Sequence, residues 1–256
     1  MNNSESAYVL SEMSWVDAEE YFKRHDIALL PVGSTEQHGP QNPLGTDHLI
    51  AFALAKEVSK KCSVLCLPPL PFGVSAHHRH FPGTIFIRPA VFREYVLDII
   101  LALNFHGIKK VVIVNGHGGN LSSLTEVAGI CRKKKVAFVV VFQWWDAIRG
   151  MFPVDEMGHA GSIETSVNLF LHGHLVKMER ARDEEVLKIP RGGFYFPLET
   201  RDLTKSGVMG ISTKASRDKG EKAFHIAAET LCRLVHVLKE IPFDVLIEQG
   251  IRAIKL

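Results

Sequence analysis

Four short apolar runs mark the first part of the chain, and turn-forming residues bound each of them. The runs span residues 27–33, 63–67, 111–114 and 137–142. They are almost continuously apolar, without the polar alternation of a half-exposed strand. Strands that are buried on both faces of a parallel sheet have this pattern. The sequence therefore predicts four buried parallel strands.

Apolar residues recur at helical spacing between and after these runs. The predicted helices span residues 15–24, 47–60, 91–106, 119–135 and 218–240. Most are long enough to connect parallel strands by crossovers. This alternation predicts the α/β class, as a three-layer α/β/α sandwich with a mostly parallel central sheet. The length suits one domain, which we expect to span residues 1–256.

Neither the strand pattern nor the helix pattern is present in the long segment 189–210, IPRGGFYFPLETRDLTKSGVMG. Long loops inside a compact domain are commonly functional. We expect this loop to lie over an active site, and a packed surface loop without a role is an equal alternative.

Charge and targeting signals limit the class of partner. The chain has 30 basic and 28 acidic residues and a formal net charge of +2, which is not the charge of a nucleic-acid binder. The start, MNNSESAYVL, has no signal-peptide pattern, and no apolar stretch reaches the roughly 18 to 20 residues of a membrane helix. We expect a cytoplasmic protein with a small-molecule partner and no membrane or nucleic-acid partner.

The four cysteines are too few and too scattered for a disulfide framework. Cys62 and Cys66 fall in one apolar run, where a strand would place them on the same face but too far apart for a disulfide. We expect buried, reduced thiols.

Chemistry-bearing segments follow each predicted strand. They are STEQHGPQNPLGTDH (34–48), PLPFGVSAHHRHFPGT (69–84), NGHGGN (115–120) and QWWD (143–146), and GHAGSIETS (158–166) opens a further helix. The carboxyl ends of parallel strands meet at one edge of a sheet, where ligands bind. We therefore expect these segments to converge on one site.

The side chains in these segments are typical metal ligands. Glu36 and His38 are two residues apart, so on an extended segment they point the same way, which suits two neighbouring ions. Asp47 could bridge such ions, which would share a hydroxide able to attack a carbonyl. His117 lies in a turn with three glycines, which let the backbone approach closely. Carboxylates and imidazoles without cysteine favour Zn²⁺, Mn²⁺ or Fe²⁺.

Each motif also has a simpler interpretation. A Glu-x-His pair is common in solvated loops, and a Gly-rich turn that opens a helix can bind phosphate. NGHGGN, however, lacks the G-x-G-x-x-G spacing and the P-loop lysine. His159 could be a helix-entry histidine, and Glu164 a solvated helix residue. Their coincidence at strand ends favours the metal site.

The motifs, taken in order, resemble those of the creatininase family of metal-dependent amidohydrolases. The resemblance covers roughly residues 28–170, and GVMGISTKASRDKGEKAF (207–224) is similar to the family's closing segment. It implies an α/β/α fold, two divalent ions per chain, and hydrolysis of a non-peptide C–N amide bond in a small molecule. It also implies a homo-oligomer, often a hexamer.

By position, the resemblance implies the metal ligands Glu36, His38, Asp47, His117 and Glu164. Asp47 would bridge the ions, with His117 on one ion and His38 on the other. Creatinine-hydrolysing members have a further Glu ligand where this chain has Gly119. Glu164 or a water would then complete the second ion's ligands.

The resemblance also implies the roles around the metals. His159 would be catalytic, since a histidine can pass a proton to the leaving nitrogen. The substrate-binding residues would be Ser75, His78 and Trp145. Arg79 stands among His77, His78 and His80, and this cluster either holds an anion such as phosphate or forms a solvated rim.

Departures from the creatinine enzymes point to another substrate. Asp155 occupies the place of a tryptophan that covers the ring of creatinine. NGHGGN resembles other branches, which include peptide-trimming members and a deformylase. The specific prediction is therefore a formamide deformylase acting on a ribosylaminopyrimidine phosphate in flavin or deazaflavin biosynthesis. The alternatives are a creatinine or other cyclic-amide hydrolase.

Two hypotheses that assign the chain to other classes of protein stay open. One is a non-catalytic metal- or nucleotide-binding protein on the same fold, although the intact set of ligands and catalytic histidine argues against it. The other is a dinucleotide-binding oxidoreductase, for which the fingerprint is missing.

Overall fold

The computed structural model describes residues 8–189, 192–193 and 196–254. Its centre is a parallel five-stranded sheet with the strand order β1-β3-β2-β4-β5. The long strands are β2 (Ile27–Val32), β4 (Lys110–Asn115) and β5 (Phe138–Gln143), and the two-residue strands are β1 (Tyr8–Val9) and β3 (Leu65–Cys66). The predicted α/β class with a parallel sheet is confirmed.

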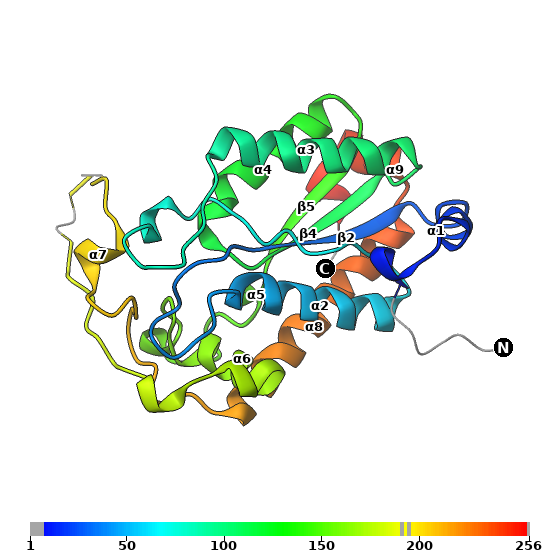
Figure 1. Cartoon of the computed structure of the whole chain (residues 1–256). Coiled ribbons are helices and arrows are strands. Elements are labelled where there is room, and N and C mark those ends of the chain that lie inside the picture. The colour runs from blue at the N-terminus through cyan, green and yellow to red at the C-terminus, as the bar shows by residue number, and fades with distance from the viewer. Residues whose placement is uncertain (1–7, 190–191, 194–195, 255–256) are drawn as a thin grey trace.

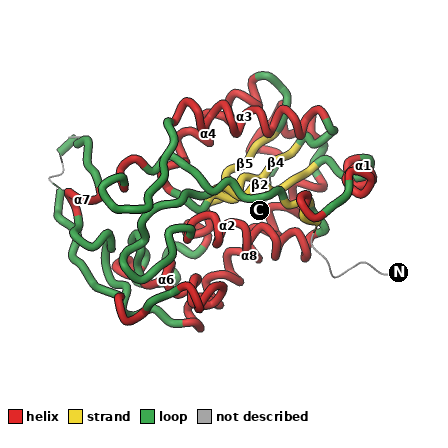
Figure 2. Tube along the Cα trace, viewed as in Figure 1, coloured by secondary structure: helices red, strands yellow, loops and turns green. Residues whose placement is uncertain are grey.

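Helices cover both faces of the sheet (Figure 1). In Figure 2 the red helices lie on either side of the yellow strands. One layer contains α1 (Trp15–Phe22), α3 (Pro89–Phe105) and α4 (Leu121–Lys133). The other contains α2 (Thr46–Cys62), α5 (Trp144–Ala147), α6 (Ser162–His172), α8 (Arg217–Glu240) and α9 (Phe243–Gln249). The three predicted layers are therefore present.

The burial of both faces of the strands explains their continuous apolar sequence. In β2, Ile27 and Leu29 pack in the core beside α2 and α8, whereas Ala28 and Leu30 pack in the core beside α3 and α4. Every residue of β2 and β4 is buried. Because both faces of these strands are covered, no position is left for an alternating polar residue.

The strand predicted at residues 63–67 is wrong in its first part. α2 continues to Cys62, and Ser63 ends it in the left-handed conformation with φ 48°. Cys62 and Cys66 therefore lie on a helix and a strand, not on one strand. Their thiols and those of Cys131 and Cys232 are free, as predicted.

The other predicted elements differ from the structure by a few residues at their ends. β1 and α9 had no predicted counterpart, because a two-residue strand and a seven-residue helix are too short to show a period. Within the described residues, no helix combines the length and apolar character that a bilayer crossing requires.

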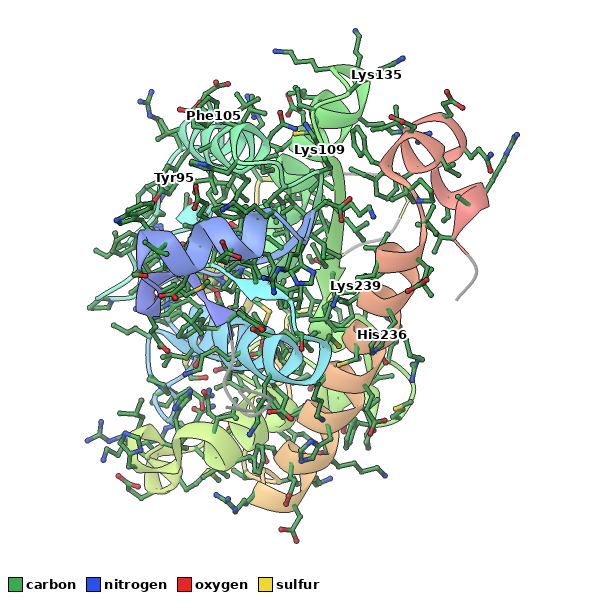
Figure 3. All side chains as sticks on the ribbon, turned by 90° about the vertical axis from the view of Figure 1, so that its right-hand side faces the viewer. Tyr95, Phe105, Lys109, Lys135, His236 and Lys239 are labelled. Atoms are coloured by element: carbon green, nitrogen blue, oxygen red, sulfur yellow. The ribbon has the colours of Figure 1, made fainter. Side chains whose placement is uncertain are left out.

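The amino ends of the strands lie at the end of the molecule that Figure 3 faces, where Lys109, Lys135 and Lys239 are labelled. Lys239, near the end of α8, donates from Nζ to the carbonyl of Ser63 at 3.2 Å and also to that of Cys62. A cation at this place stabilises the negative end of the α2 dipole. α2 is thereby fixed at the end remote from its first turn.

We expect Leu54→Ala to lower the free energy of unfolding by about 2–5 kcal/mol, because it opens a cavity in a close-packed core. Leu54 lies in α2 and is 0% exposed. Leu101→Ala on α3 is the control, since Leu101 is 39% exposed; we expect a loss within about 0.5 kcal/mol. Chemical denaturation of both variants measures the difference, and equal losses would contradict this packing.

Candidate metal centre

The carboxyl edge of the sheet brings the predicted ligand residues together. Glu36 and His38 lie in the loop after β2, Asp47 in the first turn of α2, and His117 directly after β4. These four residues are at most 3% exposed. Glu164 approaches from the first turn of α6, and its side chain is 18% exposed.

Asp47 lies at the centre of this group. Its Oδ1 is 2.8 Å from Nε2 of His38, and its Oδ2 is 3.2 Å from Nδ1 of His117. The same Nδ1 of His117 is 3.0 Å from Oε2 of Glu36. On the other side, Nε2 of His38 is 4.0 Å from Oε2 of Glu164. The two oxygens of one carboxylate thus face two different imidazoles.

The ligand atoms form sets compact enough to hold an ion. One set is Glu36, Asp47 and His117, a second is His38, Asp47 and Glu164, and a third is Glu36, His38 and His159. Within each set the candidate ligand atoms lie within 4.8 Å of one another. Asp47 is shared by the first two sets, which is the arrangement expected of a bridging carboxylate.

Buried polar atoms that lack a hydrogen bond, although their residues lie at ion-pair distance from one another, show that these residues fit a cation. Within the described part of the chain, both carboxylate oxygens of Glu36, Nε2 of His38 and Oδ2 of Asp47 are buried without a hydrogen bond. Such atoms are costly to bury unless something replaces their lost hydration. They converge on one place, and a mixed carboxylate and imidazole set suits Zn²⁺, Mn²⁺ or Fe²⁺.

The charges of the site compensate one another despite burial. Burial favours a neutral Glu36, but the neighbouring His117 holds the pKa of this carboxyl well below its usual range. Burial likewise opposes a charged His38, but Asp47 raises the pKa of its imidazole to about 10. The site thus keeps the Glu36 carboxylate ionised and holds positive charge on the imidazole beside Asp47.

His159 borders the same space from the loop before α6. Its Nδ1 is 4.0 Å from Oε1 of Glu36, and its ring centroid is 4.5 Å from that of His38 and 4.4 Å from that of His78. Burial, followed by these two imidazoles, holds the pKa of His159 well below its usual value. A neutral ring can accept a proton.

Glu164 also holds the turn that carries His159. Its Oε2 accepts a hydrogen bond of 2.6 Å from the backbone N–H of Ala160, which has a left-handed φ of 55°. Burial raises the pKa of Glu164 to about 7. At Gly119, where the resemblance implies a further ligand in creatinine-hydrolysing members, a Cβ would lie 2.3 Å from the carbonyl oxygen of Val74. A side chain does not fit there, and Glu164 is the carboxylate that reaches the second set.

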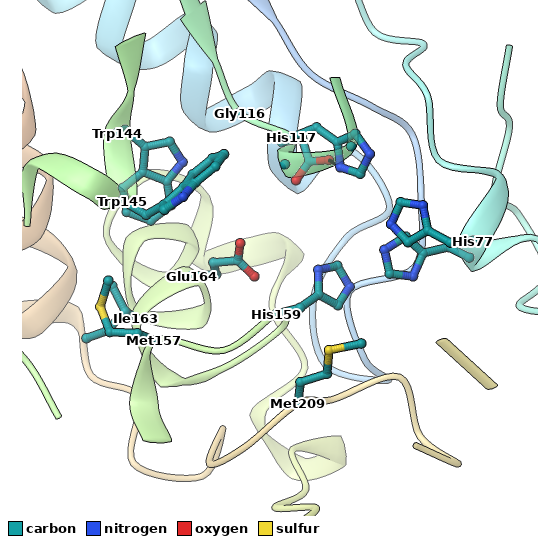
Figure 4. A pocket seen from close by; sticks show the side chains of 14 residues that line it. His77, Gly116, His117, Trp144, Trp145, Met157, His159, Ile163, Glu164 and Met209 are labelled. Atoms are coloured by element: carbon teal, nitrogen blue, oxygen red, sulfur yellow. Dashed lines mark ion pairs between the residues drawn. The ribbon is translucent and has the colours of Figure 1, made fainter. Parts of the chain in front are cut away.

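Two tryptophans stand on one side of a cavity of about 360 Å³, which Asp47, His117 and Glu164 also line (Figure 4). Trp145 was predicted, and the adjoining Trp144 meets it edge to face, with ring centroids 6.0 Å apart. No local sequence pattern indicated the other apolar lining residues, Met157, Ile163 and Met209. The cavity combines an apolar wall with a polar floor, as small-molecule sites do.

Ser75 and Asp155 are not among the residues that line this cavity. Ser75 is completely buried, and its Oγ accepts a hydrogen bond of 2.8 Å from Ser34. A substrate contact of Ser75, which the resemblance implied, stays a prediction.

The histidine and arginine cluster after β3 divides into two parts. His77 and His78 line the cavity, and Nε2 of His78 is 3.2 Å from Oε1 of Glu36. Arg79 and His80 instead both form ion pairs with Glu199. The acidic group beside Arg79 and His80 therefore comes from the chain itself, and a bound anion such as phosphate stays a prediction.

The described part of the loop at 189–210 lies against the site, as one of its two interpretations predicted. Thr200, the first residue of α7 (Thr200–Leu203), has its Oγ1 2.7 Å from Nδ1 of His78. Met209 lines the cavity and donates its N–H to the carbonyl of His159 at 2.9 Å. Residues 190, 191, 194 and 195 of this loop lie outside the described residues.

The NGHGGN turn serves to bring His117 against Asp47. A Cβ on Gly116 would lie 2.2 Å from the carbonyl oxygen of Asp47, so only glycine permits this approach. Asn115 fixes the turn by donating to the carbonyl of His117 at 2.8 Å. Asn120 joins it to the neighbouring loop by donating to the carbonyl of Gly33 at 3.0 Å. These contacts favour a ligand turn over a phosphate cradle.

The comparisons with known proteins agree with this fold. The profile of the Creatininase family, described as creatinine amidohydrolase, matches residues 11–235. The creatinine amidohydrolase of Pseudomonas putida is 30% identical over 248 residues, which cover 88% of this chain and 95% of that protein. The chain belongs to the creatininase family, and it is a hydrolase of carbon–nitrogen bonds other than peptide bonds.

Solved structures support the same assignment. A crystal structure of creatininase superposes with a TM-score of 0.84 at 28% identity, covering 92% of this chain and 99% of that one. Creatininase has also been solved in manganese and Zn-Zn forms, both with TM-scores of 0.82 at 26% identity. Metal binding is therefore a property of this fold in its solved relatives.

Other relatives act on different molecules. The mycofactocin precursor peptide peptidase of Mycobacterium tuberculosis is 32% identical over 247 residues, 89% of this chain and 91% of that protein. A 2-amino-5-formylamino-6-ribosylaminopyrimidin-4(3H)-one 5'-monophosphate deformylase of Methanothermus fervidus is 30% identical over 189 residues, 72% of this chain and 70% of that protein. The family assignment therefore leaves the substrate open.

We expect Gly116→Ala to destabilise the protein by about 1–3 kcal/mol, because the added methyl forces the β4 turn away from α2. Bound metal should fall with it, since His117 and Asp47 move apart. Gly118→Ala is the matched control, as a Cβ there meets no atom within 4 Å. Thermal unfolding and elemental analysis of both variants are the measurements. Equal stability and equal metal content of the two variants would show that the close approach of Gly116 to Asp47 is unimportant.

Proposed function

We propose that this chain hydrolyses an amide C–N bond of a small molecule at a centre of two divalent metal ions. The observation that carries the proposal is the Asp47 carboxylate, whose two oxygens face His38 and His117. The membership of Asp47 in two compact ligand sets supports it. The chain's place among amidohydrolases supplies the reaction class.

The ligands divide between the two ions. Glu36 and His117 would hold one ion and His38 and Glu164 the other, with Asp47 between them. When bound, such a pair supplies a strong nucleophile from water at neutral pH and Lewis acidity toward the carbonyl oxygen. Zinc, manganese and iron all suit these ligands. His78 would stay outside both sets and orient Glu36, whose Oε1 is 3.2 Å from its Nε2.

His159 is the residue that moves the proton. Its neutral ring can take a proton at Nδ1, the nitrogen that lies 4.0 Å from Oε1 of Glu36. Returned from the same atom to the leaving nitrogen, this proton allows the C–N bond to break without expelling an unstable amide anion. Met209, hydrogen-bonded to the carbonyl of His159, helps to hold the ring over the ligands.

The cavity selects a compact substrate. Its volume of about 360 Å³ admits a small ring or a short chain next to the ligand residues. Trp144 and Trp145 would pack against a flat or apolar part of the molecule and exclude water from it. The reacting amide would then lie between this wall and His159.

The specific candidate substrate is a formamide of a ribosylaminopyrimidine phosphate. The observation that favours it is the position of Arg79 and His80. Both hold the carboxylate of Glu199, so this place already accommodates an anion. A phosphate would have to displace Glu199, which would move the segment that carries Thr200. A creatinine-like cyclic amide needs no such anion site and is the alternative.

Elemental analysis tests the metal centre. We expect the purified wild-type protein to bind about two divalent ions per chain and Asp47→Asn to lose most of both, because one carboxylate serves both sets. Asp183→Asn is the control: Asp183 accepts a 2.7 Å hydrogen bond from Thr213 away from the site. Two ions retained in Asp47→Asn, or none in the wild type, would refute the shared ligand.

Kinetics with matched substrates test the specific candidate. We expect the phosphorylated formamide to be hydrolysed with a KM about 10-fold or more below that of its dephosphorylated analogue, since a charge-assisted contact to Arg79 stabilises binding. Arg79→Ala should raise the first KM and leave the second unchanged. Hydrolysis of creatinine with neither formamide consumed would instead establish the alternative.

A further inference from the structure

Gln37 lies between Glu36 and His38 in the first loop, the loop after β2. Its side chain is buried, and no sequence pattern predicted a role for it. It is 4% exposed, and its Nε2 is 2.8 Å from Nε2 of His159 and 3.0 Å from Nδ1 of His78. These two histidines come from segments far along the chain. The amide thus joins the first loop to both imidazoles.

The orientation of this amide is fixed by the backbone. The N–H of Gly39 donates to Oε1 of Gln37 at 2.9 Å, and Nε2 of Gln37 donates to the carbonyl of Gly207 at 3.2 Å. A rotation by 180° would place donor against donor and acceptor against acceptor. Gly207, at φ 86°, packs so closely that a Cβ would lie 1.9 Å from Oε1 of Gln37. The NH₂ group is therefore held on the side of the histidines.

Nε2 of His159 has two partners on this one residue. The backbone carbonyl oxygen of Gln37 is 2.9 Å away and can accept a proton from Nε2, while the side-chain NH₂ is 2.8 Å away and can donate one. A neutral imidazole has one protonated and one unprotonated nitrogen. Nε2 therefore keeps a hydrogen bond in either neutral tautomer.

We propose that Gln37 is a positioning residue that holds His159 through Nε2 in both neutral tautomers, leaving Nδ1 directed at the metal ligands. The proposal rests on the proton-transfer role proposed for His159. When Nε2–H donates to the Gln37 carbonyl, Nδ1 presents a lone pair. When Nε2 accepts from the amide, Nδ1 presents an N–H. The ring keeps one orientation in both cases.

The position of the Gln37 side chain also depends on the loop over the site, which includes Gly207. Gly207 is part of the segment that continues to Met209, which hydrogen-bonds the carbonyl of His159. The amide and this segment therefore support each other, and His159 is held from both. Gln41, in the same first loop as Gln37, instead donates to the carbonyl of Ala160 and to the hydroxyl of Thr165.

The test compares Gln37→Met with Gln41→Met. Gln37→Met keeps the length of the side chain and removes its donor. Gln41 lies in the same loop, is 1% exposed and donates to the carbonyl of Ala160 at 2.8 Å without a hydrogen bond to an imidazole. Both variants are measured with metal bound, for thermal stability, metal content and histidine ring ¹⁵N chemical shifts, with His159→Gln used to assign the signals of His159.

In Gln37→Met we expect the His159 ring signals to move to those of the Nε2-protonated tautomer, because the carbonyl is then the remaining partner. With an amide that the wild type hydrolyses, kcat should fall about 10- to 100-fold with KM little changed, as is usual when a supporting hydrogen bond is lost. Gln41→Met should lose stability but keep the wild-type His159 signals. Gln37→Glu, which keeps the Gly39 contact, should likewise keep the proton on Nε2 of His159, because a carboxylate can only accept from this nitrogen.

Unchanged His159 signals in both Gln37 variants, or a fall in kcat that only follows loss of fold or metal, would overturn the proposal. The ring signals need no substrate. If the wild-type protein hydrolyses no amide but the Gln37 variants show the tautomer shift, the proposed function is refuted and the positioning role of Gln37 stands.

Discussion

The structure depends on one electrostatic constraint: two carboxylates, Glu36 and Asp47, are buried side by side at the end of a parallel sheet. Buried carboxylates persist only when positive charge or hydrogen bonds replace their hydration. Here His38 and His117 lie against them, but several of their polar atoms have no hydrogen bond among the described residues. The proposed centre of divalent cations would resolve this constraint and would give the site its chemistry.

The fold supplies the close approaches that this constraint requires. Asp47 lies in the first turn of α2, where the helix dipole favours negative charge, and the far end of α2 is fixed by Lys239. Gly116 lets the turn after β4 touch the backbone of Asp47. The apolar layers on both faces of the sheet therefore hold a polar cluster at its edge, and the loop that carries Met209 covers it.

Much of this could be predicted from local pattern, and what could not has a physical reason. Unbroken apolar runs predicted β2, β4 and β5, and the rule that chemistry follows parallel strands placed Glu36, Asp47 and His117 together. Cys62 was misplaced because a helix end and a short strand share one apolar run. Gln37 and Met209 were missed because their partners lie more than 100 residues away in sequence or in a loop without periodicity, where no local pattern reports a contact.

The most direct measurement is anomalous X-ray diffraction from crystals of the protein loaded with zinc or manganese, recorded on both sides of the metal absorption edge. The account predicts two anomalous peaks, about 3.5 to 4 Å apart, on either side of the Asp47 carboxylate. One peak should lie near Glu36 and His117 and the other near His38 and Glu164. A single peak, or two peaks that do not share Asp47, would contradict the bridged centre.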